Sequence, residues 1–202
     1  MRFFFALAVL CAATTASAEV RFINGTGQPL TVDVLHADKQ ERGIALPSGP
    51  ALSKVYGAKL GANDQEMIVV YDGAGKELLR QEVQNNFVVV LNKSGSGVSA
   101  EYNTRFQGRV SEPKGFQIFN ATGGMPTYKV ELPDFSVRDT KGTTPKAGSV
   151  TTDSFSNLGD EGARVKTTID VNGMSLVVPE MKLGGVYHLV KAGDALKIET
   201  IR

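Results

Sequence analysis

An internal repeat is the feature of this sequence that most constrains its fold. Val20-Arg-Phe-Ile-Asn-Gly-Thr-Gly27 returns as Phe116-Gln-Ile-Phe-Asn-Ala-Thr-Gly123, 96 positions later. Near the end of each half, residues 88–95 match residues 186–193 with a separation of 98. The difference of two positions indicates a short loop insertion between the matched segments. Self-similarity over such a long period predicts two copies of one structural module.

Both copies have the periodicity of short β-strands. In residues 165–171, the apolar-side residues Val165, Thr167, Ile169 and Val171 alternate with Lys166, Thr168 and Asp170, which is typical of a half-buried strand. Asn-Gly at 172–173 predicts a hairpin turn, and the wholly apolar run 87–91 predicts a central strand. We therefore expect an all-β protein, a tandem repeat of two small immunoglobulin-like antiparallel β-sandwich domains. The strands expected are 20–23, 30–36, 67–71, 77–83, 87–91 and 98–102, with a short strand at 55–56 as a further candidate, then 115–119, 127–132, 150–155, 164–171, 175–178, 186–190 and 196–201.

Turn residues and composition changes divide the chain into segments. We expect a first sandwich over 19–104, a linker over 105–114 and a second sandwich over 115–202. Residues 37–62 and 133–148 are predicted as long loops at matched places in the two modules. Long loops at matched places are common positions for binding function.

The first 18 residues resemble a cleaved export signal. Arg2 is a short basic region, residues 3–12 are apolar, and Ala16-Ser-Ala18 is a small-residue cleavage site. Cys11, the single cysteine, would leave with that segment, so the mature protein is expected to have no disulfide. An exported chain without disulfides favours a bacterial periplasm.

Charge and aromatic content argue against several classes of partner. Removal of residues 1–18 takes away one Arg and leaves 21 basic and 21 acidic side chains. A neutral chain has no overall field that would attract nucleic acid or an anionic membrane. Tryptophan is absent, which argues against a sugar site built on stacked aromatic rings.

The sequence contains no recognisable catalytic motif. Ser111-Glu-Pro-Lys114 fits a Ser-x-x-Lys pattern, but Pro113 disfavours the helix that this pattern needs. His36 and His188 are the only histidines, and neither has a second ligand at metal spacing. Each is expected to be a packed or edge histidine. We expect a protein that is not an enzyme and has no cofactor and no bound metal.

Basic residues in the expected linker form the candidate binding site. Arg105, Arg109 and Lys114 lie between the two modules, with Glu112 as the nearest acidic residue. Their positive charge could contact an acidic polymer or an acidic partner protein, and a solvated linker is the alternative. Three glycosylation-type sequences, at Asn24, Asn92 and Asn120, are interpreted as turn chemistry instead.

Taken together, these segments resemble a known family. They are similar to the small periplasmic AlgF-type protein of bacterial exopolysaccharide (alginate) O-acetylation, which has counterparts in acetylated-cellulose systems. The residues that carry the resemblance are 20–27 and 116–121, Ser156-Asn-Leu-Gly-Asp160, Val165-Lys-Thr167 and Val171-Asn-Gly173.

The resemblance implies a role without catalysis by this chain. A membrane O-acyltransferase would bring acetyl groups across the inner membrane, and periplasmic transferases would place them on sugar hydroxyls. This protein would be an adaptor that binds those O-acetyltransferase proteins, and the polysaccharide is a second candidate partner. The alternative is a secreted carbohydrate-binding or adhesion module with no role in acetyl transfer.

Overall fold

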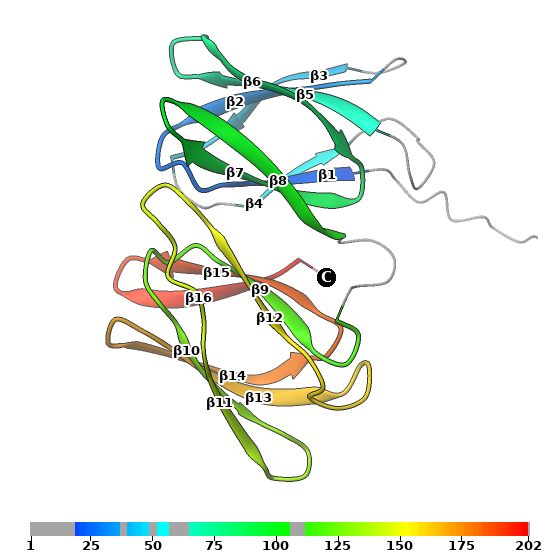
Figure 1. Ribbon diagram of the computed structural model, residues 1–202, viewed down its shortest axis with the longest axis vertical. Coiled ribbons are helices and arrows are strands. Elements are labelled where there is room, and N and C mark those ends of the chain that lie inside the picture. The colour runs from blue at the N-terminus through cyan, green and yellow to red at the C-terminus, as the bar shows by residue number, and fades with distance from the viewer. Residues whose placement is uncertain (1–18, 37–39, 49–51, 57–64, 106–111, 202) are drawn as a thin grey trace, which may run out of the picture.

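The computed structural model describes residues 19–36, 40–48, 52–56, 65–105 and 112–201. Within these residues the protein is all-β: its strands form four sheets of four strands each, and there is no helix. The predicted export signal at 1–18 lies outside the described residues. Figure 1 shows the four sheets stacked as successive layers along the long axis of the molecule.

The first half of the chain builds two of these sheets. One sheet has the order β4-β1-β7-β8 and the other has the order β3-β2-β5-β6. The strands are β1 (Glu19–Asn24), β2 (Leu30–Leu35), β3 (Gln40–Leu46), β4 (Leu52–Tyr56), β5 (Gln65–Asp72), β6 (Glu77–Gln84), β7 (Phe87–Ser94) and β8 (Gly97–Arg105).

The second half builds the other two sheets. Their orders are β12-β9-β15-β16 and β11-β10-β13-β14. The strands are β9 (Phe116–Asn120), β10 (Thr127–Glu131), β11 (Val137–Lys141), β12 (Thr151–Phe155), β13 (Arg164–Val171), β14 (Met174–Lys182), β15 (Val186–Ala192) and β16 (Ala195–Thr200).

Strands of the two halves correspond in order and direction. β1 pairs in parallel with β7 and antiparallel with β4, and β9 pairs in parallel with β15 and antiparallel with β12, so the expectation of purely antiparallel sheets is wrong for one strand pair in each half. The apolar run at 87–91 lies in β7 between β1 and β8, as predicted for a central strand. The predicted hairpin turn is confirmed, because Asn172 and Gly173 connect β13 to β14 with φ of 50° and 81°.

Each half has its own apolar core, formed between its two sheets. In the first half, Phe22, Val32 and Ile68 belong to one buried cluster. In the second half, Phe116, Tyr128 and Ile169 belong to another. Burial of side chains of this size is the main favourable contribution to folding.

A third apolar cluster joins the two halves. Five of its members lie on the faces of β1, β7, β9 and β15 that point away from the core of their own half, and the other two lie just before β12 and just after β16. The members are Ile23, Val88, Val90, Phe119, Val150, Val186 and Ile201. Consequently β9 is buried at every position, on both of its faces. The two halves therefore pack against each other through the middle layers in Figure 1.

Hydrogen bonds at the edge of this cluster also connect the halves. The Arg21 guanidinium donates to the carbonyl of Ile201 at 2.6 Å. The backbone N–H of Val150 donates to the Asn92 side-chain oxygen at 2.9 Å. These bonds satisfy polar groups that packing would otherwise leave buried without a partner.

Asn24 and Asn120 close equivalent turns. Asn24 Nδ2 donates to the carbonyls of Gln28 at 2.8 Å and Pro47 at 2.9 Å, and its Oδ1 accepts from Thr26. Asn120 Nδ2 donates to Gly124 at 3.0 Å and Thr143 at 3.1 Å, and its Oδ1 accepts from Thr122. Both side chains are buried. Their interpretation as turn residues is confirmed.

The long loops expected at 37–62 and 133–148 are wrong in part. β3 and β4 lie within the first segment, and β11 occupies residues 137–141 of the second. All three are edge strands, each paired to only one neighbour. Every residue of β11 is exposed. Backbone hydrogen bonds can hold an edge strand that buries no face. The side chains of such a strand therefore need not alternate between apolar and polar.

Candidate functional site

The structure does not bring the three predicted basic residues together as a described cluster. Arg105 is the last residue of β8, where it pairs with Phe87, and its side chain lies outside the described part. Arg109 lies outside the described residues altogether. Lys114 is exposed in a turn just before β9, and its carbonyl accepts a hydrogen bond from Leu158 at 2.8 Å. The basic linker stays a prediction.

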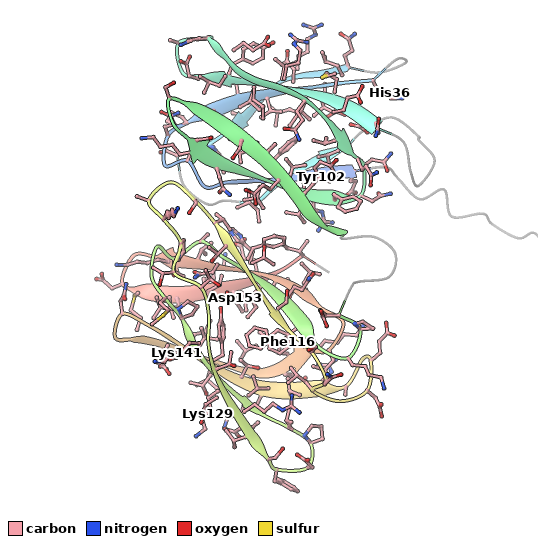
Figure 2. The ribbon with its side chains drawn as sticks, in the orientation of Figure 1. His36, Tyr102, Phe116, Lys129, Lys141 and Asp153 are labelled. Atoms are coloured by element: carbon pink, nitrogen blue, oxygen red, sulfur yellow. The ribbon has the colours of Figure 1, made fainter. Side chains whose placement is uncertain are left out.

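An open depression on the second half is a better-defined candidate. It has a volume of about 520 Å³ and lies over β10, β11 and one end of β13. Five of the polar residues that line it are Thr127, Lys129, Asp139, Lys141 and Asp170, which we call the lysine–aspartate face. Figure 2 shows Lys129 and Lys141 on the lower half of the molecule.

Strand register explains why these side chains share one face. Thr127 of β10 lies opposite Lys141 of β11 on one side and Asp170 of β13 on the other. Lys129, two positions further along β10, lies opposite Asp139. Side chains two positions apart on a strand point to the same side of the sheet.

The charged groups of the lysine–aspartate face are open to a ligand. Among the described residues, no ion pair within 4.0 Å involves Lys129, Lys141, Asp139 or Asp170. Two ammonium donors, two carboxylate acceptors and the Thr127 hydroxyl are thus presented together. This donor and acceptor set suits a polyhydroxylated ligand or the polar surface of another protein.

A buried polar pair lies beneath this face. The Tyr128 hydroxyl donates to Asp153 Oδ2 at 2.7 Å, and Asp153 Oδ1 accepts from the Thr143 backbone at 2.8 Å. Figure 2 places Asp153 in the interior of the second half. Burial, together with the hydrogen bond to Asp153, raises the pKa of Tyr128 far above its ordinary value. Tyr128 is therefore a neutral donor that fixes β10 against β12.

Both histidines lie away from the lysine–aspartate face. His36 follows β2 in the first half. His188 lies on β15 and is 0% exposed, so the expectation of a packed histidine is confirmed for it. Because His188 has no solvent contact, it cannot exchange a proton with a substrate at the surface.

A metal-binding group and a membrane-spanning helix are both absent from the described ranges. There, no three residues among His, Cys, Asp and Glu are grouped as a metal ion would require. No helix that could cross a bilayer occurs in the same part of the chain.

Comparison with known proteins adds no relative. No protein-family model matches the chain, and a search of curated proteins found no match.

Sequence reasoning found only part of the lysine–aspartate face. The alternation in 164–171 already placed Asp170 on the polar side of its strand. Asp139 and Lys141 were missed because they fell in a segment predicted as a loop. Their spacing of two, with Thr140 between them, is compatible with a strand but is too common to have indicated one.

Proposed function

We propose that this chain is a non-catalytic periplasmic adaptor that supports O-acetylation of an exopolysaccharide by partner acetyltransferases. The proposal rests on the predicted export signal and on the resemblance to the AlgF type. The observation that carries it furthest is the lysine–aspartate face, an exposed sheet surface whose four charged groups lack ion-pair partners among the described residues. Such a surface is suited to contact with a polymer or a protein.

We also infer that the two halves are copies of one immunoglobulin-like β-sandwich module. The corresponding strand orders and the matching Asn24 and Asn120 turns support this inference. The likeness to immunoglobulin domains concerns the layering, because the hairpins β2–β3 and β5–β6 give a strand order different from that of a constant domain.

The experiment is deletion of the gene in the bacterium that makes the polymer. We expect polymer yield to be maintained while acetyl groups per sugar, measured by NMR, fall strongly, and we expect the native gene to restore them. Complementation with the double variant Lys129→Ala and Lys141→Ala tests the site, since it should restore less acetylation than the native gene. Fully acetylated polymer from the deletion strain would contradict the proposal.

A carbohydrate-binding module is the second candidate function. The mixture of ammonium, carboxylate and hydroxyl groups on the lysine–aspartate face favours it, because sugars are held by such hydrogen bonds. Binding of the purified protein to a glycan array, lost in the same double variant, together with unchanged acetylation in the deletion strain, would favour this function over the adaptor.

A further inference from the structure

Phe135 stands out at the tip of the hairpin between β10 and β11. Its side chain is 94% exposed, and its φ is 63°. Left-handed backbone of this kind is uncommon for residues other than glycine, and it is a genuine outlier for a bulky residue. The chain therefore accepts both an unfavourable backbone conformation and an exposed aromatic ring at one position. The Phe135 ring belongs to neither of the two apolar cores.

Local hydrogen bonds fix the tip in this conformation. The N–H of Leu132 donates to Ser136 at 2.9 Å, and the N–H of Phe135 donates to Leu132 at 3.0 Å. Asp134 Oδ1 accepts from both the backbone and the hydroxyl of Ser136, at 3.0 and 2.6 Å. The aromatic ring is thus presented by a closed turn, which lowers the entropy lost when it binds.

The surroundings of Phe135 resemble the rim of a protein interface. A depression of about 270 Å³ beside it is lined by Leu132, Pro133, Val137 and the stems of two basic residues. The ammonium of Lys166 pairs with Glu131 at 2.8 Å, and Arg164 pairs with Glu180. Both basic groups are therefore neutralised. Asp134 differs, because no ion pair within 4.0 Å involves its carboxylate among the described residues; Ser136 holds it by the hydrogen bonds described above, and the charge of Arg138 adds a weaker attraction.

We propose that Phe135 is the anchor of a protein-binding surface, entering an apolar pocket of a partner protein that carries a basic group at its rim opposite Asp134. Aromatic anchors that fill a pocket, surrounded by polar groups contributing little, are the usual anatomy of a binding hot spot. Hydrogen bonds from Ser136 lower the pKa of the Asp134 carboxyl, so it is charged at neutral pH. The inference does not require the partner to be an acetyltransferase.

Charge argues against an anionic membrane as the binding partner of Phe135, and interface size argues against a second copy of the chain. An anionic membrane would repel the Asp134 carboxylate next to the ring, and the basic groups of Arg164 and Lys166 beside it are already paired. A second copy of the chain would bury only two hairpin tips, whereas stable interfaces cover about 1,200–2,000 Å². A concave partner that encloses the tip meets both conditions.

The test begins with a photo-crosslinking residue in place of Phe135, introduced into the full chain in the bacterium that produces it. The same residue in place of Val177, which is 52% exposed on β14, is the matched control. The proposal expects one protein to crosslink from position 135 and not from 177. That protein is then purified and titrated with the native chain.

Three variants separate binding from folding. Phe135→Ala should raise the dissociation constant by about 30-fold or more, as expected for a hot-spot residue. Val177→Ala should change the dissociation constant less than about 2-fold. Phe135→Asn should weaken binding as strongly and keep the melting temperature equal to or above that of the native protein, because Asn tolerates this backbone conformation. Asp134→Asn should weaken binding mainly at low salt.

Several results would overturn the proposal. They are the absence of a crosslink from position 135, crosslinking to a second copy of the chain, and an unchanged affinity in Phe135→Ala. Binding of the native protein to vesicles of phosphatidylglycerol and phosphatidylethanolamine, lost in Phe135→Ala, would show a membrane contact instead.

Discussion

His188 occupies the place in the second half that Val90 occupies in the first. Val90 pairs with Ile23 in the parallel ladder of β1 and β7, and His188 pairs with Phe119 in the corresponding ladder of β9 and β15. Val90, Ile23 and Phe119 all belong to the cluster between the halves. An ionisable ring thus stands where the repeat has an aliphatic side chain, and neither of its nitrogens has a hydrogen-bond partner.

Acid should destabilise the protein through His188. Burial lowers the pKa of His188, and this outweighs the opposing effect of Glu199, whose Oε2 lies 3.5 Å from Nδ1. The unfolded chain, with an ordinary histidine pKa near 6.5, then binds more protons than the folded chain as the pH falls below that value. The free energy of unfolding should therefore decrease on acidification below about pH 6.5, by at most about 1.4 kcal/mol per pH unit from this group.

Urea unfolding at a series of pH values measures this effect. His188→Val should remove the contribution of His188 to the slope, and Glu199→Gln should make the slope steeper, because Glu199 favours the charged ring. An identical pH dependence in the native protein and in His188→Val would contradict the assignment.

Packing between the halves should stabilise both of them. Phe119→Ala removes a large, fully buried side chain from the joining cluster, and such substitutions cost about 3–5 kcal/mol. We expect a single unfolding transition at lower urea concentration. Val177→Ala on the exposed face of β14 is the control and should change stability by less than about 0.5 kcal/mol. Two separate transitions in the native protein would show that the halves unfold independently.

The two asparagine turns should be equally important to folding. Asn24→Ala or Asn120→Ala removes several hydrogen bonds of a buried side chain and leaves the carbonyls that it bonded without that donor, so we expect a loss of about 2–4 kcal/mol for each. Gln28→Ala is the matched control for the first turn, because the Gln28 side chain is exposed and only its backbone takes part. Thermal unfolding measures all three. A loss below about 0.5 kcal/mol in either Asn variant would mean that its turn forms without it.

Replacement of the basic linker residues tests the site predicted from sequence. Arg105, Arg109 and Lys114 changed together to Ala should weaken association with an acidic partner most at low ionic strength, because exposed charges are screened over roughly 8 Å at physiological salt. The melting temperature should hardly change. Binding that is equal at low and high salt in native and variant proteins would leave these residues as a solvated segment.

Strands with one buried face could be predicted from the sequence, whereas edge strands could not. In β13, Val165, Thr167 and Ile169 alternate with polar residues and are buried, so periodicity located the strand. β11 has the sequence Val-Arg-Asp-Thr-Lys and is exposed throughout. β11 forms because its backbone pairs with β10. That pairing requires no pattern of apolar and polar side chains, so the sequence does not indicate it.

The lysine–aspartate face also combines a part that the sequence predicted with a part that it did not. The alternation around Asp170 placed it on a polar side, but its neighbours Asp139 and Lys141 arrive from β11. Charge on an edge strand is also a common protection against aggregation, so its presence alone indicates no ligand. The contact between the halves was equally hidden, because no sequence period reveals that β9 is covered on both faces.

Burial of β9 on both faces makes each half-molecule incomplete. A half produced alone would expose the apolar surface formed by Phe119 and Val186 on one side, or by Ile23 and Val88 on the other, and exposed surfaces of that kind drive association. A chain cut between β8 and β9 should therefore stay together as a complex of two fragments. The protein can be treated as a split system, in which reassembly of the separately produced pieces reports directly on the strength of the central contact.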